Sequence, residues 1–338
     1  FSVATKDIIQ QGGCFVPGTR IMTHRGLIPI EEIVEGHARA FAATHQGYKE
    51  VTARFDNGSK DVYEVTTASG LRVATTGEHK FLTFNENGEF FLAPLSTLKT
   101  GDHAVMFLGQ WRDDIPCVPL FTTIPEPSKY SYGRKDMTLP EVFTQDLAFL
   151  VGVYHADGSK IADEHSPNGK GIRIAMAKDR PEDLKTILGV IERCFAIAPK
   201  LHHGDGAVWD VEIFSRALNE YLVKNKLMKT SSVTVTVPEQ VFRSPQSVVA
   251  AYIAGVFMGD GTNRGGKGGL RITTVSRQFA QQLQLLLLNL GIASRIKVQE
   301  RKTQGWRTLY AVTVNGETFM KRFVRLLAPW TEKVNDHP

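Results

Sequence analysis

The chain has 338 residues, a formal net charge of +5, a hydrophobic fraction of 42% and a charged fraction of 22%. These values predict a globular protein of two or three domains and argue against a disordered chain. The longest apolar run, residues 248–258, is too short to cross a bilayer, and we find no N-terminal signal pattern. Three scattered cysteines without a Cys-x-x-Cys pair argue against a disulfide framework or zinc cluster and predict a cytoplasmic location.

Residues 1–13 form a short polar lead that ends in two glycines, directly before Cys14. A short amphipathic helical turn is expected at residues 27–36. Strand-like runs follow at residues 49–55, 61–67, 71–75, 80–84 and 90–95, separated by Asn-Gly, Ser-Gly and Thr-Gly turns. Short, evenly spaced strands with such turns are typical of an all-β unit.

Cys14 is a candidate nucleophile because a thiol is the best side-chain nucleophile near neutral pH. At this position it could attack the carbonyl carbon of Gly13 and convert the peptide bond to a thioester. His79 could give a proton to the departing amide nitrogen, and Thr76 could hydrogen-bond the same peptide. Taken singly, Cys14 fits a small buried side chain and His79 fits a solvated turn.

Together these residues resemble the Hint module of inteins. Cys14 resembles the first intein residue, Thr76-Gly-Glu-His79 the internal Thr-x-x-His motif, and residues 95–102 the turn that closes the N-terminal half. The resemblance covers residues 14–108 and implies an autocatalytic splicing module. Residues 1–13 would then belong to a host protein (extein), and they faintly resemble ribonucleotide reductase large subunits. The resemblance also implies a C-terminal closing piece, which we do not find here, so this chain alone is not expected to complete splicing.

Residues 109–140 are rich in proline and polar residues, and they predict a linker or an extra DNA-contacting arm.

Two runs further along the chain are similar to each other. Residues 150–158 read Leu-Val-Gly-Val-Tyr-His-Ala-Asp-Gly, and residues 253–261 read Ile-Ala-Gly-Val-Phe-Met-Gly-Asp-Gly. Each run has small residues four apart on one helical face, a spacing that lets two helices approach closely. These pairs are Gly152 with Ala156 and Gly255 with Gly259.

Each run ends in an Asp followed by a Gly. We expect Gly158 and Gly261 to be left-handed C-caps, which puts Asp157 and Asp260 in the last turns of their helices. If the helices pair, the two carboxylates lie side by side and repel each other unless a cation lies between them. Oxygen ligands of this kind suit Mg²⁺ or Mn²⁺.

The region 141–338 repeats the same order of expected elements, with halves at about 141–235 and 236–330. Each half is predicted to contain a motif helix, two strands, a helix, two strands and a closing helix. This order predicts a pseudo-twofold α+β fold with two αββαββα halves. Pseudo-twofold symmetry suits a DNA duplex, because DNA half-sites are related by a twofold axis.

Both runs resemble the LAGLIDADG motif of homing endonucleases, in which paired motif helices place two acids that hold metals for cutting both DNA strands. The resemblance carries over to Asp157 and Asp260, as catalytic residues and metal ligands. His155 and Met258 depart from the motif at a position that is not usually a metal ligand. Val235 stands where related sequences often have a catalytic Lys, and Lys229 or Lys297 are weak substitutes.

Basic residues are concentrated in the second half. Residues 250–330 carry 12 Lys and Arg against 3 Asp and Glu, whereas residues 14–110 carry 9 against 11. Such clustering predicts a nucleic-acid partner, with a merely soluble basic face as the alternative. The resemblance implies that the partner is double-stranded DNA, bound by a protein monomer through the strands. The candidate DNA contacts are Lys160, Arg173, Lys200, His202, His203, Arg264, Lys267, Arg271, Arg295, Lys297, Arg301 and Arg307. A non-catalytic DNA-binding protein on a decayed endonuclease scaffold is the alternative.

Overall fold

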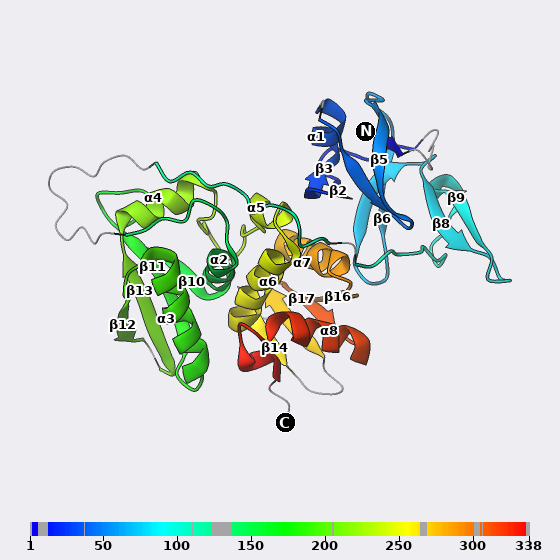
Figure 1. Ribbon diagram of the computed structural model, residues 1–338. Coiled ribbons are helices and arrows are strands. Elements are labelled where there is room, and N and C mark those ends of the chain that lie inside the picture. The colour runs from blue at the N-terminus through cyan, green and yellow to red at the C-terminus, as the bar shows by residue number, and fades with distance from the viewer. Residues whose placement is uncertain are drawn as a thin grey trace.

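The computed structural model describes residues 13–36, 38–109, 111–123, 137–204, 206–263, 269–300, 305 and 307–335, together with the backbone of residues 2–5. Figure 1 shows a strand-rich N-terminal part beside two α/β halves, and the N-terminal part lies next to the second half. Within these described ranges, no helix has the length and apolar character needed to span a membrane.

The N-terminal part consists almost entirely of strands. They are β1 (Ser2–Thr5), β2 (Arg20–Thr23), β3 (Gly26–Pro29), β4 (Phe41–Thr44), β5 (Gly47–Phe55), β6 (Val62–Thr66), β7 (Arg72–Thr76), β8 (Lys80–Phe84) and β9 (Phe90–Pro94), with α1 (Ile30–Glu35) and the 3-10 turn η1 (Leu95–Thr97). Five strands pair in the order β1-β5-β4-β2-β3, and β6–β7 and β8–β9 form separate hairpins. The all-β character expected here is present. The sequence missed β4, and it missed β1, which pairs with β5 where only a polar lead was expected. The helical turn expected at residues 27–36 is α1 at Ile30–Glu35, whereas residues 26–29 form β3 and pair with β2.

The rest of the chain repeats one order of elements. The first half has α2 (Gln145–Asp157), β10 (Gly158–Ile161), β11 (Gly171–Ala177), α3 (Pro181–Phe195), β12 (Lys200–His203), β13 (Val208–Phe214) and α4 (Arg216–Lys224). After the short α5 (Glu239–Phe242), the second half has α6 (Gln246–Asp260), β14 (Gly261–Asn263), β15 (Leu270–Thr274), α7 (Arg277–Asn289), β16 (Arg295–Gln299), β17 (Leu309–Val314) and α8 (Glu317–Leu327), and η2 (Glu332–Asn335) follows. The sheets run β10-β11-β13-β12 and β14-β15-β17-β16. The predicted αββαββα order is confirmed in both halves.

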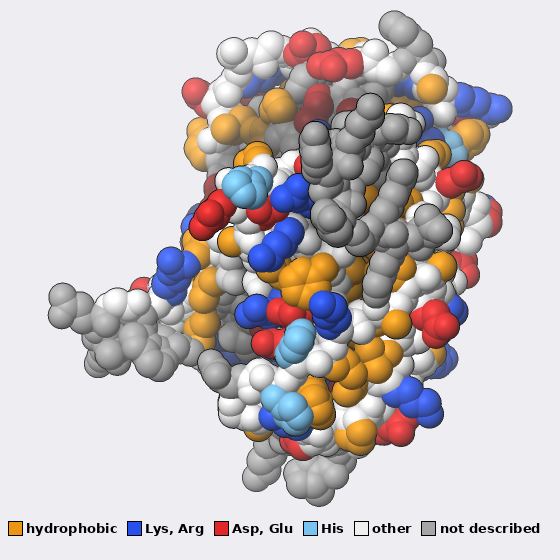
Figure 2. Space-filling view, turned by 90° about the vertical axis from the view of Figure 1, so that its left-hand side faces the viewer, with side chains coloured by type: hydrophobic (Ala, Val, Ile, Leu, Met, Phe, Trp, Pro, Cys, Tyr) orange, Lys and Arg blue, Asp and Glu red, His pale blue; other side chains and the backbone are white. Residues whose placement is uncertain are grey.

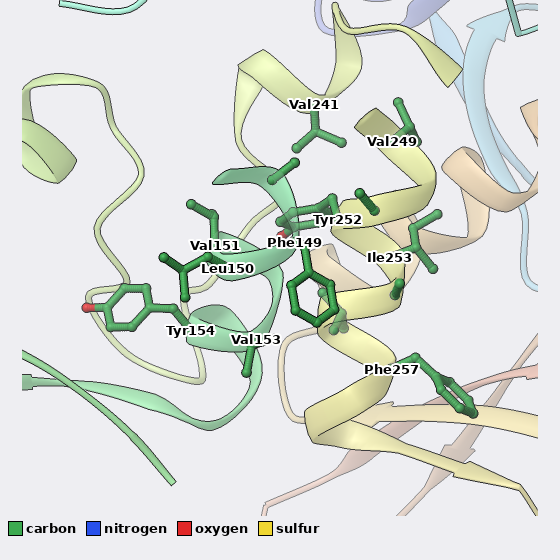
Figure 3. Packing of buried hydrophobic residues seen from close by; sticks show 14 of the residues in the cluster. Phe149, Leu150, Val151, Val153, Tyr154, Val241, Val249, Tyr252, Ile253 and Phe257 are labelled. Carbon is green, nitrogen blue, oxygen red and sulfur yellow. The ribbon is translucent and has the colours of Figure 1, made fainter. Parts of the chain in front are cut away.

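Helices α2 and α6 lie side by side at the centre of this region (Figures 1 and 3). Both are apolar on all sides, as expected for helices that are buried on all sides. Residues 147–155 of α2 and 248–258 of α6 are all buried. They belong to one continuous core that also includes Met22 and Leu27 of the N-terminal part. A smaller cluster around Ile28, Ile33 and Val51 lies inside the N-terminal part.

The glycines that end the two motif helices correct one expectation. Gly158 has φ −91° and Gly261 has φ −79°, so both are extended rather than left-handed. Each glycine starts a strand, and a glycine is needed there because no room is left for a side chain. A Cβ on Gly158 would lie 2.2 Å from Tyr154 Cδ2, and one on Gly261 would lie 2.2 Å from Phe257 O. The chain turns so tightly from helix to strand that a side chain would collide with the last helical turn.

The N-terminal part is joined to the second half by polar contacts on two sides. Arg20 donates to both carboxylate oxygens of Glu239, at 3.1 and 2.6 Å, and its guanidinium lies 3.7 Å from the ring centroid of Phe242. At the β6–β7 turn, Ile296 N–H donates to Ser69 O at 2.9 Å. These bonds hold the hairpin tip against the edge strand β16.

The segment predicted as a linker is ordered where it is described. Trp111 is buried and its indole N–H donates to Ser244 O at 2.9 Å, while Asp113 accepts from Ser247 N–H at 2.9 Å. Residues 111–113 therefore pack against the approach to α6, whereas the end of this segment bonds to the first half, where Phe121 N–H donates to Asn225 Oδ1 at 2.9 Å. Residues 124–136, the alternative DNA-contacting arm, lie outside the described residues.

Candidate functional site

The seam between α2 and α6 is as narrow as the small-residue spacing predicted. A Cβ on Gly152 would lie 2.2 Å from Tyr252 O, and one on Gly255 would lie 2.1 Å from Phe149 O. At the same seam, a Cβ on Gly259 would lie 2.5 Å from the Ala156 methyl carbon. Side chains at these positions would force the helices apart, because each contact is made with backbone or with a neighbouring small residue.

Asp157 and Asp260 occupy the last positions of the paired helices. Asp260 is half-buried, and the Asp157 side chain is partly open to solvent although the surrounding protein encloses its carboxylate. Burial raises the pKa of Asp157, and burial together with the negative charge of Asp157 raises the pKa of Asp260 to about 7. A Cβ on Gly259 would lie 2.8 Å from Asp157 Oδ2. The Asp157 carboxylate therefore reaches across the seam to the last turn of α6, which carries Asp260. The two acids therefore interact as two close negative charges.

Two lysines lie beside this pair of acids, one from each half. Lys229 Nζ donates to Ala156 O at 2.8 Å, and Lys333 Nζ donates to Met258 O and Gly259 O, both at 2.8 Å. Burial lowers the pKa of both lysines, whereas Asp157 and Asp260 act to raise it.

Lys229 was considered from the sequence, but Lys333 was missed. Lys333 lies in η2, beyond the repeated elements, and no motif near it suggested a site. The signal that could have found it is its distance from the second motif, because Lys333 follows Asp260 by 73 residues and Lys229 follows Asp157 by 72.

The donors at this site fit a divalent cation that is shared with a substrate. Among the described residues, no group of three or more His, Cys, Asp or Glu side chains could hold a metal by itself. Two carboxylates fit Mg²⁺, which commonly binds one or two protein carboxylates and completes its shell with water and substrate phosphates. Burial is the main cause of the elevated pKa of Asp260 and the negative charge of Asp157 adds to it, and a bound cation would offset both.

On the second sheet, three candidate basic residues share one face. Arg271 and Arg295 both lie opposite Thr313, and Lys297 lies opposite Ala311. Directly opposed residues point to the same side of a sheet, and the alternate residues are buried against the helices. The three basic side chains therefore lie on the open face, the side of the sheet away from the helices, with no acidic residue among their direct partners in the ladder. Arg271 is half-buried there, and Arg295 Nε donates to Ala68 O of the N-terminal part at 3.2 Å.

On the first sheet, the matching face carries both signs of charge. Arg173 and Lys200 lie opposite Glu212, and His202 lies opposite Asp210. Arg173 Nε donates to Glu212 Oε1 at 2.8 Å, and His202 Nε2 lies 3.3 Å from Glu212 Oε2. Figure 2 faces this end of the molecule and shows basic, acidic and His side chains intermingled on its surface.

The pairing register of β10 and β11 corrects one of the candidate DNA contacts, Lys160. Lys160 lies opposite the buried Ile172, so it is on the other side of the sheet from Arg173 and donates to Pro167 O at 2.6 Å. Arg307 is exposed next to β17. Three candidates lie outside the described residues: Arg264, Lys267 and Arg301. His203 is paired with Trp209, with ring centroids 4.2 Å apart.

A second constellation surrounds Cys14, which is buried at 6% exposure. Its N–H donates to Thr76 Oγ1 at 3.1 Å, and its carbonyl accepts from Thr76 N–H at 3.1 Å and from Thr75 Oγ1 at 2.6 Å. The amide of Asn57 donates to Cys14 Sγ at 3.2 Å. Sequence reasoning missed Asn57, since nothing in the sequence connects a loop asparagine to a cysteine 43 positions earlier.

His79 lies against Gly13, the residue on the other side of the Gly13–Cys14 peptide bond. It is buried at 5% exposure, and its Nδ1 has no hydrogen-bond partner among the described residues. A Cβ on Gly13 would lie 2.6 Å from that nitrogen, so Gly13 is in contact with the ring. Burial lowers the pKa of His79 to about 4, which makes the imidazole neutral near pH 7. The structure thus places Thr76 and His79 around the Gly13–Cys14 bond.

Comparison with known proteins bears on the second half. Residues 247–328 match the LAGLIDADG-like domain. Among curated proteins, the chain is 25% identical over 190 residues to a glutamine–fructose-6-phosphate aminotransferase of Methanocaldococcus jannaschii, covering 56% of this chain and 16% of that protein. It is 26% identical over 290 residues to a component of the A-type ATP synthase of Pyrococcus abyssi, covering 82% of this chain and 26% of that protein.

A third relative is the NrdEB alpha chain of the ribonucleoside-diphosphate reductase of Bacillus subtilis, at 20% identity over 288 residues, 81% of this chain and 24% of that protein. The chain thus spans about a quarter or less of these relatives. Among solved structures, the chain is similar to I-DmoI in complex with DNA and Mn, with TM-score 0.41, 18% identity and coverage of 58% of this chain and 99% of that one. It is also similar to the N-terminal LAGLIDADG domain of DUF199/WhiA, with TM-score 0.37, 14% identity and coverage of 54% and 82%.

Proposed function

We propose that the region from α2 onward is a metal-dependent endonuclease for double-stranded DNA. The observation that carries this proposal is the pair of coupled carboxylates, Asp157 and Asp260, at the adjoining ends of α2 and α6. Each end is flanked by one half of a duplicated fold whose sheet carries basic residues on its open face. The match of residues 247–328 to the LAGLIDADG-like domain supports the same function.

The chain's own residues have distinct tasks in this mechanism. Asp157 and Asp260 would hold the divalent cation, which when bound supplies an activated water and charge stabilisation for a phosphodiester. Lys229 and Lys333 place two positive charges next to the carboxylates, where they can bind phosphate oxygens. The open sheet faces would orient the duplex, because strand side chains can reach base edges in the major groove.

The test uses the full chain and a pool of plasmids that carry random inserts. We expect linear product with Mg²⁺ or Mn²⁺ and none with EDTA. Asp157→Asn and Asp260→Asn should each abolish cutting while DNA affinity is retained. Asp163→Asn is the matched control, because Asp163 pairs with Arg216 within the first half. Among the described residues, neither of these two side chains contributes to the raised pKa values of the acid pair. Cutting by Asp260→Asn at the wild-type rate would overturn the assignment.

The alternative is a DNA-binding protein that does not cut. The same experiment separates the two, because such a protein would retain plasmids in a filter-binding assay without linearising any of them. The presence of both acids favours the nuclease, because two carboxylates held together at these helix ends have no use in a protein that binds DNA only through its sheets. Burial and the charge of Asp157 raise the pKa of Asp260, as expected at a functional site.

We further propose that the N-terminal part carries out an N-to-S acyl shift at the Gly13–Cys14 bond. The Cys14 thiol loses its proton, its sulfur attacks the Gly13 carbonyl carbon, the C–N bond breaks and the freed nitrogen takes up a proton. The hydrogen bonds of Thr75 and Thr76 hold the Cys14 peptide on both sides, and His79 lies against Gly13 with an open nitrogen. This cluster is the observation that favours a second activity.

The relatives support the idea of an inserted element. They carry the names of unrelated enzymes, and yet each is matched over only about a quarter of its own length or less. On this proposal, residues 14–108 are a Hint-type splicing module and residues 1–13 belong to the host protein. A ribonucleotide reductase as the host, a monomeric state and a cytoplasmic location stay predictions.

The acyl shift can be tested with an added thiol, which traps a thioester by exchange. The chain should split after Gly13, and mass spectrometry should find a fragment that begins at Cys14. Cys14→Ala should block the reaction, and His79→Ala should slow it by about 10²–10⁴-fold. Cys117→Ala is the matched control, because that thiol lies outside the cluster. An intact bond in the wild-type chain would show that the module is inert, whatever the result with DNA.

A further inference from the structure

Lys229 is held at the acid pair by the helix that carries Asp157. It lies in the turn after α4, where Lys226 adopts a left-handed φ of 54° and Leu227 N–H donates to Leu222 O at 2.7 Å. From there Lys229 Nζ reaches Ala156 O, one residue before Asp157. The position of the ammonium therefore depends on how the segment 227–229 is attached to the last turn of α2.

Two side chains of that last turn bind the segment. Tyr154 Oη donates to Met228 Sδ at 2.8 Å, and His155 Nε2 lies 2.9 Å from Leu227 O. Figure 3 shows Tyr154 on the side of α2 that faces away from α6. Leu227 is fully buried, so its carbonyl has no access to water as a substitute partner. The bond from His155 is therefore the stronger of the two attachments, because a buried carbonyl without a partner is costly.

The hydrogen-bond partners of His155 fix its tautomer. A carbonyl can only accept, so Nε2 carries the hydrogen that is donated to Leu227 O. In the neutral ring Nδ1 is then an acceptor, and it receives the hydroxyl of Tyr252 at 2.9 Å. Tyr252 belongs to α6 and is fully buried. One relay of two bonds thus runs from α6 through His155 of α2 to the segment that carries Lys229.

In the second half, the segment that carries the corresponding lysine, Lys333, is attached by different residues. The position that corresponds to His155 is Met258, which has no ring nitrogen, and the segment of Lys333 is instead held by Asn263 of β14. Val334 is fully buried and its carbonyl accepts from Asn263 Nδ2 at 3.0 Å. The departure from the motif at His155 is therefore specific to the first half, where the lysine-bearing segment needs a side chain to attach it.

We propose that His155 is a positioning residue for Lys229. By donating from Nε2 to Leu227 O, it keeps the Lys229 ammonium beside Asp157 and Asp260, and through Tyr252 it ties that arrangement to the paired helix. The consequence for cleavage rests on the nuclease function proposed above. The placement of Lys229 does not, and it can be measured without DNA.

Two substitutions distinguish the role of Nε2 of His155 from the role of Nδ1. Gln places an amide N–H near the position of Nε2 and can restore the donation to Leu227 O, whereas Asn reaches only the position of Nδ1. Each variant is treated with N-hydroxysuccinimidyl acetate, and mass spectrometry follows acetylation of Lys229, with Lys333 as the internal control. In His155→Asn we expect acetylation of Lys229 to rise about tenfold while Lys333 is unchanged, and in His155→Gln we expect protection to return.

Cleavage is measured in single turnover with saturating DNA. His155→Asn should cut about tenfold more slowly at unchanged DNA affinity, and it should have no further effect in a Lys229→Ala background, because residues that act through one another are not additive. Additive losses would overturn the proposal. Three acetylation results would also overturn it. They are an equal rise in acetylation of Lys229 and Lys333 in His155→Asn, no rise in acetylation of Lys229 in that variant, and a His155→Gln variant that behaves like His155→Asn. Absence of cutting by the wild type would refute the nuclease function, and acetylation would still decide the role of His155.

Discussion

Replacing Asp260 by Asn should stabilise the protein when no divalent cation is present. Burial and Asp157 raise the pKa of Asp260 from its ordinary value of 3.8 to about 7. The folded state therefore holds this proton more tightly than the unfolded chain, and stability falls as pH rises between the two values. At about 1.4 kcal/mol per pKa unit the full difference corresponds to about 4 kcal/mol. Partial exposure of the side chain reduces the expected effect to about 2 kcal/mol.

The assay is thermal unfolding of wild type and Asp260→Asn in EDTA, at intervals from pH 4 to pH 8.5. The curves should coincide near pH 4 and separate as pH rises, with the variant more stable by about 4–8 °C at pH 8. Mg²⁺ should raise the melting temperature of the wild type only. Asp163→Asn serves as the control of opposite sign, since the backbone N–H of His165 and the side chain of Arg216 lower the pKa of Asp163. A constant difference between wild type and Asp260→Asn at every pH would refute the reasoning.

The other predictions concern the DNA face, the seam and the joint between the parts. Lys297→Ala should reduce the slope of log affinity against log salt by about 1, whereas Lys160→Ala should leave it unchanged, as titrations at several salt concentrations would measure. Gly255→Ala should cost about 3 kcal/mol or more, because its Cβ would lie 2.1 Å from a backbone oxygen of α2, and thermal unfolding reports it. Glu239→Gln removes the shared partner of Arg20 and Arg243, so limited proteolysis should cut the N-terminal part from the second half more rapidly.

Much of the α/β region was predictable because its signals are local. Helix α3 spans Pro181–Phe195, and a proline at its first position together with an amphipathic spacing marks it clearly in the sequence. The two motif helices were predictable from their apolar runs and small-residue spacing. The strands β6 to β9 lay within one or two residues of expectation, because Gly-containing turns separate them.

The errors arose where position depends on register or on distant contacts. Lys160 was assigned to the DNA face, but a shift of one position along a strand moves a side chain to the other side of the sheet. Lys333 and Asn57 reach their sites through tertiary packing, which no local pattern encodes. Gly158 was assigned to a left-handed cap, whereas the contact with Tyr154 is what excludes a side chain there.

The two lysines also explain how an acid can end each motif helix. A carboxylate in the last turn meets the negative end of the helix dipole, which costs roughly 0.3–1 kcal/mol. The last carbonyls of a helix also lack partners within the helix. Lys229 and Lys333 meet both needs at once, because each ammonium donates to carbonyls of the final turn and brings a positive charge to the acids. Removing either lysine would therefore weaken a helix end as well as the site, so its effects on folding and on cleavage must be measured separately.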